Sequence, residues 1–182
     1  MIVFCLVNTY DKLKLHEIHL RTIARAMPLC YAFDMHLALL DFGFWRDERE
    51  LVKSIVEYTT IGEHGRYALE LLKMNRIHLV DSIPSHFGEV IATTSKPDDE
   101  KKICLKDLIN IIKRKSTTFL IGLGRRGLPR DLLKRVRYHY DVTERGVSLE
   151  TCTAMGVIAT TIWFAKRWSD GGNKVLSGTR IL

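Results

Sequence analysis

The sequence predicts a single α/β domain, spanning residues 1–182, with a mostly parallel sheet and helices on both of its faces. Segments with the composition of strands alternate with segments of helical periodicity along the whole chain, which is typical of a parallel sheet with crossover helices. The runs at 2–7 and 117–121 are apolar without clean alternation, as expected for strands buried on both sides. A length of 182 residues suits one domain with one core.

Strands are expected where β-branched, aromatic and aliphatic residues gather between turn-forming residues. The first is the run IVFCLV, and the fifth, TTFLI, ends in a glycine-rich turn. In chain order, the expected strands are residues 2–7, 36–40, 76–80, 89–94, 117–121 and 137–142. The polar stretch KPDDEKK at 96–102 is expected to connect two elements of the same domain.

Helices are expected between these strands, where apolar residues recur every three or four positions. In chain order, they are residues 15–27, 46–58, 63–74, 105–113, 129–134 and 149–167. The first helix is expected to bury an inward stripe made of Leu15, Ile18, Thr22, Ile23, Ala26 and Met27. A tail beginning near residue 169 contains three glycines and is expected to be loosely held.

The last helix carries two adjacent apolar faces, which together exceed the stripe of roughly 100° that a surface helix needs. Gly156 lies in its interior, where glycine costs about 0.5–1 kcal/mol relative to alanine. We therefore expect another backbone to approach this helix closely. That backbone belongs either to the sheet or to a second subunit.

The net charge of +7 is confined to one part of the chain. Residues 101–145 contain 13 Lys and Arg against 4 Asp and Glu, whereas the other residues contain 15 against 17. A localised basic surface indicates an anionic polymer as partner, with RNA as the leading candidate. The alternative is an ordinary solvated helix face.

The cysteines and the hydropathy indicate a cytoplasmic protein without membrane segments. The four cysteines, Cys5, Cys30, Cys104 and Cys152, form no CxxC pair, which favours free thiols over disulfides or a zinc site. No apolar run is long enough to span a bilayer. The first apolar run meets polar residues too soon for a signal peptide. His16 and His19 share a helical face but have no third ligand nearby, so no metal is predicted.

The glycine-rich turn at 122–127 is the first candidate binding site. Gly122, Gly124 and Gly127 let backbone groups approach a flat ligand. Their spacing formally matches the dinucleotide motif G-x-G-x-x-G. However, the turn lies late in the chain, contains Arg125 and Arg126, and leads into Pro129, so a nicotinamide dinucleotide site is disfavoured.

The start of the last helix is the second candidate. Ser148 is expected to cap this helix by accepting from the amide of Glu150 or Thr151. Free amides there, with the hydroxyls of Thr143, Thr151 and Thr153, offer donors for a carboxylate or a ribose. An ordinary capped helix remains the alternative reading of Ser148.

These segments resemble the motifs of the SPOUT superfamily of α/β-knot RNA methyltransferases. The family motif G-x-E-x-x-G-L resembles residues 122–128, and the motif S-L-N-V-S-x-A resembles residues 148–154. The first motif, a strand-end asparagine followed by a helix with R-T-A, resembles Asn8 and residues 21–24. The chain departs at Gly124 and Glu150, where the family has glutamate and asparagine, and at an insertion over 9–18. The whole chain is similar to a small archaeal family of uncharacterised proteins in this superfamily.

The resemblance implies a trefoil knot over about residues 88–167 and a bound S-adenosylmethionine. It implies that three loops hold this cofactor, through Thr93, Thr94, Ser95, Gly122, Leu123, Gly124, Gly127, Val142, Thr143, Val147, Ser148, Leu149, Thr151 and Thr153. It further implies a homodimer through the first and last helices, and a catalytic Arg21 or Arg25 near the transferred methyl group.

The implied reaction is methylation of RNA, with a ribose 2′-hydroxyl of tRNA or rRNA as the favoured acceptor. The residues expected to contact RNA are Asn8, Arg125, Arg126 and Arg130. Two alternatives stay open. One is a catalytically silent knot protein that binds RNA or a nucleotide, and the other is an ordinary nucleotide-binding α/β enzyme whose glycine turn only imitates the motif.

Overall fold

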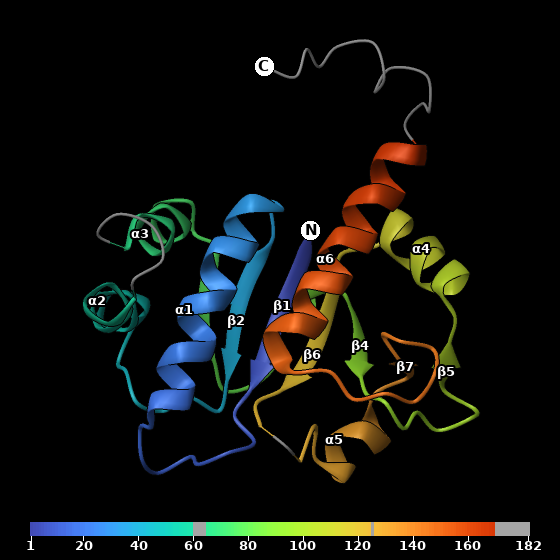
Figure 1. Ribbon diagram of the computed structural model, residues 1–182, viewed down its shortest axis with the longest axis horizontal. Coiled ribbons are helices and arrows are strands. Elements are labelled where there is room, and N and C mark those ends of the chain that lie inside the picture. Colours follow the sequence, from blue (N-terminus) through green and yellow to red (C-terminus); the bar gives the residue numbers. More distant parts are fainter. Residues whose placement is uncertain (60–64, 125, 170–182) are drawn as a thin grey trace.

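The fold is built on one seven-stranded, wholly parallel sheet (Figure 1), seen in a computed structural model that describes residues 1–59, 65–124 and 126–169. The strands are β1 (Ile2–Val7), β2 (His36–Leu40), β3 (Ile77–Val80), β4 (Glu89–Thr93), β5 (Lys102–Ile103), β6 (Thr117–Gly122) and β7 (Tyr138–Tyr140). Their order in the sheet is β3-β2-β1-β6-β4-β7-β5, and every pairing is parallel. The predicted α/β class with a parallel sheet is confirmed.

All six predicted strands are present, and one strand was missed. The missed strand, β5, is only two residues long and pairs with β7 at the edge of the sheet. It begins in the segment expected to be a polar connection. Two residues offer too short a pattern to distinguish a strand from a turn.

The helices that follow the strands are α1 (Glu17–Ala32), α2 (Glu48–Tyr58), α3 (Arg66–Lys73), α4 (Leu105–Arg114), α5 (Arg130–Arg135) and α6 (Thr151–Ser169), with a short 3₁₀ turn, η2 (Ser85–Phe87). The prediction ended the first helix at residue 27, which is wrong. The helix continues through Pro28 to Ala32, and this extension buries Cys30 completely. Two residues of the predicted inward stripe, Leu15 and Ile18, are exposed at the start of the helix, while the other four are buried.

Helices cover both faces of the sheet, but unequally. On one face, strand residues such as Phe4 and Phe119 pack with α1, α2, α3, α4 and α6 in a single core cluster. On the other face, Val3, Cys5 and Leu120 pack under Phe87 and the half-buried leucines of α5. Figure 1 shows α1 and α6 in front of the sheet and α5 at its lower end. Because fewer residues cover this second face, α5 has no fully buried residue.

The helix α6 lies beside α1 and is partly uncovered. The thiol of Cys152 donates a long hydrogen bond of 3.6 Å to the carbonyl oxygen of Thr22, which links the two helices. A Cβ atom at Gly156 would meet nothing within 4 Å. The close backbone approach expected at Gly156 is therefore not found within the described part of the chain. Val157 and Phe164 on the same helix are exposed.

No helix among the described residues is long and apolar enough to cross a membrane. The four cysteines are free, with Cys5 and Cys30 buried. The threading of the chain into a knot stays a prediction.

Candidate functional site

The candidate site lies where the parallel strands end. Because all strands run in the same direction, the loops after β1, β4, β6 and β7 emerge at one edge of the sheet, the lower edge in Figure 1. In open α/β sheets, ligands bind in crevices at this edge. The three segments predicted to hold a cofactor are the loops after β4, β6 and β7, so each of them lies here.

Hydrogen bonds join these three loops to one another. The hydroxyls of Ser95 and Ser148 lie 2.8 Å apart, which links the loop after β4 to the loop after β7. The hydroxyl of Thr151 donates to the carbonyl oxygen of Gly122 at 3.1 Å, which links the start of α6 to the end of β6. Thr93 donates to the carbonyl oxygen of Leu120 at 2.7 Å. Segments far apart in the sequence are therefore held together as one constellation.

Asp141 fixes the shape of the loop after β7. Its buried carboxylate accepts from the amide and hydroxyl of Thr143, at 3.0 and 2.9 Å, and from the amide of Gly146 at 2.6 Å. Burial by itself raises the pKa of Asp141, but the hydrogen bonds from Gly146 and Thr143 outweigh it, and the pKa lies below its ordinary value. The carboxylate of Glu144 accepts from the amide of Leu105 at 3.0 Å, which ties the loop to α4. The loop is thus preorganised.

Glu150, and not Ser148, caps the last helix. The helix begins at Thr151, and the carboxylate of Glu150 accepts from the amide of Thr153 at 3.1 Å. The predicted cap is wrong because Ser148 lies outside the helix and reaches Ser95 instead. A carboxylate at this end interacts favourably with the helix dipole. The sequence predicted free amides here for a ligand's carboxylate, but the amide of Thr153 is already bonded to Glu150.

The glycine turn presents backbone with little side-chain cover. Gly122 has no room for a Cβ atom, which would lie 2.5 Å from the carbonyl carbon of Gly127. Gly124 and Gly127 have φ of +101° and +64°, a region that favours glycine. A Cβ on Gly127 would meet nothing within 4 Å. Leu123, which was predicted to contact the cofactor, points its side chain into the core, so it can offer only backbone groups.

Exposed aliphatic side chains lie in the loop that leads into α6. Val147 is 55 % exposed and Leu149 is 37 % exposed there. Exposed apolar side chains with a few hydroxyls near them are typical of a small-molecule site. The remaining residues predicted to bind cofactor, Thr94 and Val142, follow β4 and β7 at the same edge.

The loop after β1 is organised by Asn8. Its side chain is 1 % exposed, and its amide nitrogen donates to the carbonyl oxygens of Asp11, at 2.8 Å, and Asp41, at 3.2 Å. Its amide oxygen accepts from the amide of Tyr10 at 3.3 Å. The predicted contact of Asn8 with RNA does not fit this geometry, because every polar atom of the side chain already has a partner within the loop.

Two histidines, His16 and His19, bind residues of this loop. The Nδ1 atom of His19 accepts from the amide of His16 at 2.9 Å, so the ring is neutral and its Nε2–H donates to Asn8 at 3.2 Å. Burial, followed by the nearby His16, lowers the pKa of His19. His16 lies 2.8 Å from the carboxylate of Asp11 and, with two backbone amides, lowers the pKa of that carboxyl to about 2. Among the described residues, no group of three or more His, Cys, Asp or Glu side chains is placed to hold a metal ion.

Tyr10 is a site residue that the sequence reasoning missed. Its ring is 56 % exposed and packs edge-on against His16 and His19, at centroid distances of 5.2 and 5.8 Å. A Cβ atom on Gly124 would lie 3.6 Å from this ring, and the neighbouring Thr9 hydroxyl donates to the carbonyl oxygen of Leu123. The aromatic ring therefore stands beside the glycine turn. The only signal in the sequence was an aromatic residue within the insertion at 9–18.

The two candidate catalytic arginines have different surroundings. Arg21 forms an ion pair with Glu17, whose carboxylate also accepts from the hydroxyl of Tyr58 at 3.0 Å. The contacts with Tyr58 and Glu17 raise the pKa of Arg21. Arg25 is exposed and lies near the thiol of Cys152 on α6. Of the two, Arg25 lies near the start of α6, while Arg21 is engaged by Glu17, which also binds Tyr58 of α2.

The arginines predicted to contact RNA follow the glycine turn. Arg126 and Arg130 are exposed. Arg125 lies outside the described residues.

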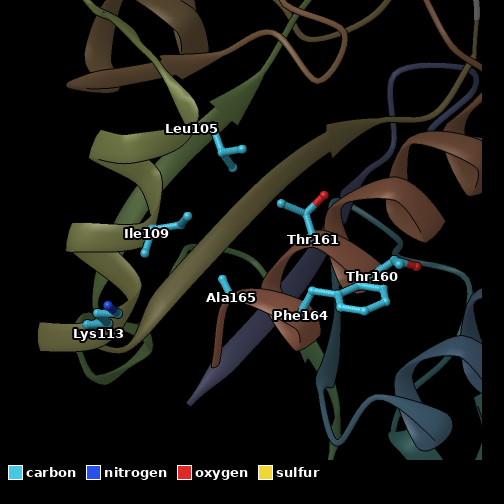
Figure 2. Close-up of a pocket in the computed structure, with 7 residues that line it drawn as sticks. All are labelled: Leu105, Ile109, Lys113, Thr160, Thr161, Phe164 and Ala165. Carbon is cyan, nitrogen blue, oxygen red and sulfur yellow. The ribbon is translucent and has the colours of Figure 1, made fainter. Parts of the chain in front are cut away.

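A separate apolar groove of about 590 Å³ lies between α4 and α6. Figure 2 shows side chains of both helices lining it, namely Leu105, Ile109, Lys113, Thr160, Thr161, Phe164 and Ala165. The first α6 residue that lines the groove, Thr160, lies nine positions after Thr151. The groove is therefore distinct from the constellation at the edge of the sheet.

Sequence comparison places the chain in a family. The family model "Protein of unknown function (DUF531)" matches residues 2–163. An uncharacterised protein of Methanocaldococcus jannaschii, MJ0224, is 47 % identical over 158 residues, which cover 87 % of this chain and 90 % of that protein.

Solved structures show the same fold at low sequence identity. TrmJ from Z. mobilis has a TM-score of 0.61 at 14 % identity, with 91 % of this chain and 69 % of that chain covered. The TrmH/SpoU tRNA modifying enzyme of A. aeolicus has a TM-score of 0.58 at 12 % identity, with 93 % and 77 % covered. The chain therefore belongs to the DUF531 family, and its fold is that of the SPOUT methyltransferases.

Proposed function

We propose that this protein is an RNA methyltransferase that uses S-adenosylmethionine and modifies a ribose 2′-hydroxyl of tRNA or rRNA. The observation that carries the proposal is the junction of the three loops, through Ser95 with Ser148 and Thr151 with Gly122. This junction forms a preorganised constellation of glycine backbone, hydroxyls and aliphatic side chains at the carboxyl edge of the sheet. The shared fold with TrmJ and with the TrmH/SpoU tRNA modifying enzyme supports the same reading.

When bound, the sulfonium group of the cofactor supplies an activated methyl group, so the protein mainly has to align the acceptor oxygen. Tyr10 provides an exposed ring beside Gly124 on which a base can stack. Arg25 is exposed near Cys152, close to the start of α6, and would hold an RNA phosphate next to the acceptor. Arg21 is the weaker candidate, because Glu17 and Tyr58 already engage it.

The functional unit we propose is a homodimer formed through α1 and α6, with the chain threaded into a knot over about residues 88–167. The exposed face of α6 supports the dimer, since Gly156 is open and Val157 and Phe164 are uncovered in one chain. An uncovered apolar helix face commonly marks an interface. A second subunit at Gly156 would also account for a glycine in the middle of a long helix.

A catalytically silent RNA- or nucleotide-binding protein of the same fold is the second candidate. It is favoured by the replacement of the family's turn glutamate by Gly124 and of its asparagine by Glu150, whose carboxylate is taken up as a helix cap. The two candidates make opposite predictions for methyl transfer, which therefore separates them.

The decisive experiment is nucleoside mass spectrometry of RNA from cells with and without this gene, together with methyl transfer in vitro. The purified protein and S-adenosylmethionine should restore a 2′-O-methylated nucleoside in RNA from cells that lack the gene. An identical set of modified nucleosides in both RNAs, with no transfer in vitro, would reject the enzyme and leave the silent binding protein.

A further inference from the structure

The surface that extends from the glycine turn over α5 to β7 is strongly basic and lacks ionic partners. Residues 126–137 contain five cations, Arg126, Arg130, Lys134, Arg135 and Arg137, against the single acid Asp131. All five cations are exposed. Within the described part of the chain, none of them takes part in an ion pair. Their charge is therefore available to a partner.

The helix α5 is held so that its cations point outward. Its inner leucines, Leu132 and Leu133, pack on the second face of the sheet. Its last turn is clamped by Lys101, whose ammonium donates to the carbonyl oxygens of Leu133, at 3.0 Å, and Lys134, at 2.6 Å. The buried His139 lies 3.0 Å from the same carbonyl of Leu133. The cations of α5 therefore lie on a helix that is fixed to the rest of the domain.

An aromatic ring lies at the far end of this surface. The guanidinium of Arg137 stacks over the half-buried ring of Tyr138, 5.0 Å from its centroid. Attraction between the cation and the ring restrains the guanidinium, whose planar N–H donors suit a phosphate. Interleaved cations and aromatic rings are typical of surfaces that bind single-stranded nucleic acid.

The basic surface is continuous along the chain with the candidate site. Arg126 lies inside the glycine turn, and Leu128 and Pro129 lead directly into α5. The exposed ring of Tyr10 lies beside Gly124 of the same turn. A nucleotide placed at Tyr10 would therefore have neighbouring phosphates within reach of α5.

We infer that α5 and the start of β7 form a phosphate-binding surface that holds the RNA next to the nucleotide to be methylated. This inference rests on the proposed function, because RNA is the substrate there, and it adds the direction in which the RNA leaves the site. The partner is the sugar–phosphate backbone of a single-stranded or looped segment. Its recognition is by charge and stacking and does not depend on base sequence.

A matched pair of residues makes the test sharp. Arg130 and Lys134 are four positions apart on α5, and Arg49 and Lys53 have the same spacing and residue types on α2, which covers the opposite face of the sheet. Both control residues are exposed. They differ in their surroundings, because α2 also carries Glu48, Glu50 and Glu57.

The experiment measures binding of a fluorescein-labelled tRNA transcript by anisotropy over a series of salt concentrations. The double variant Arg130→Gln, Lys134→Gln should bind about 10-fold more weakly than wild type, and the salt slope should fall by about 0.7–0.9 for each lost phosphate contact. The double variant Arg49→Gln, Lys53→Gln should bind like wild type. Calorimetry should give both variants the wild-type affinity for S-adenosylmethionine, which shows that the folded site is intact.

Equal losses in the two variants, or no loss in either, would overturn the inference. It would also be overturned if the α5 variant kept RNA binding and lost binding to phosphatidylglycerol vesicles, which would assign the surface to a membrane. The proposed function fails separately, when wild type transfers no methyl group to RNA. In that case a loss of RNA binding in the α5 variant would still establish the surface.

Discussion

The hydroxyl of Thr151 donates a hydrogen bond of 3.1 Å to the carbonyl oxygen of Gly122, and so joins the first residue of α6 to the last residue of β6. These residues are far apart in the sequence, and both were predicted to bind the cofactor. The bond also satisfies a carbonyl group at the end of the strand, where the ladder of the sheet ends.

Replacing Thr151 by valine should loosen this junction. The change keeps the shape of the side chain and removes the donor, so we expect the free energy of unfolding to fall by about 0.5–1.5 kcal/mol. Affinity for S-adenosylmethionine should fall several-fold, because the turn is then less preorganised. Urea unfolding and calorimetry measure the two effects. Thr160→Val, on the exposed side of the same helix, is the control, and equal behaviour of the two variants would contradict the role of Thr151.

Replacing Gly156 by leucine should break the proposed dimer without unfolding the chain. A Cβ atom at this position meets nothing within 4 Å in one chain, so we expect the monomer to keep its stability. At a close helix–helix contact between subunits, the same side chain would clash. Light scattering after size-exclusion chromatography should report a monomer. Gly43→Leu is the matched control, since Gly43 is also open but lies outside α1 and α6. A dimer that persists in Gly156→Leu would exclude this interface.

The two arginines of α1 should differ in their effect on methyl transfer. Arg25→Ala should lower kcat by about 100-fold or more, the scale expected when a positioned catalytic group is lost. Arg21→Ala should leave kcat within a few-fold of wild type and mainly affect stability, through the lost contacts with Glu17 and Tyr58. Steady-state kinetics with saturating RNA separates the two. A larger loss of kcat in Arg21→Ala than in Arg25→Ala would assign the catalytic role to Arg21.

Stability should fall in mild acid because of two stacked histidines. The rings of His36 and His78 are parallel within 7°, with Nδ1 of His36 3.0 Å from Nε2 of His78. Burial, followed by His78, lowers the pKa of His36 to about 4, and burial lowers the pKa of His78 as well. The unfolded chain takes up these protons near pH 6.5, whereas folded His36 takes up its proton only near pH 4. The free energy of unfolding should therefore decrease as the pH falls through this window.

The variant His36→Gln should flatten that dependence, because glutamine does not titrate. Urea unfolding at several pH values between about 4 and 7 measures it. His86→Gln, at an exposed position, is the control. A wild-type stability that is constant over this range would show that the two histidines take up protons equally in both states.

The sequence predicted the strands well because each long strand is a continuous apolar run flanked by turns. It missed β5, whose two residues owe their strand conformation to pairing with β7. It ended α1 at Met27, before Pro28, but tertiary burial of Cys30 outweighs the hydrogen bond that proline removes. The local sequence pattern predicted an element correctly where core burial requires apolar residues in it. It failed where contacts with residues far away in the sequence determine the conformation.

At the candidate site, the resemblance named segments that do lie at one edge of the sheet, but it did not give the contacts of their side chains. Ser95 and Ser148 were correctly assigned to neighbouring loops, whereas the capping role passed from Ser148 to Glu150. Asn8 was expected to face RNA and is instead buried as the organiser of its loop. Tyr10 gave no spacing signal, because it approaches Gly124 only through the three-dimensional path of the insertion. Such contacts depend on loop geometry, which composition does not encode.

Calorimetric titration of the purified protein with S-adenosylmethionine tests the central claim most directly. The claim predicts saturable binding of one cofactor per chain, equal or tighter binding of S-adenosylhomocysteine, and no binding of ATP or of a nicotinamide dinucleotide. Absence of heat and of any stabilisation at millimolar S-adenosylmethionine, or tighter binding of a dinucleotide, would contradict it.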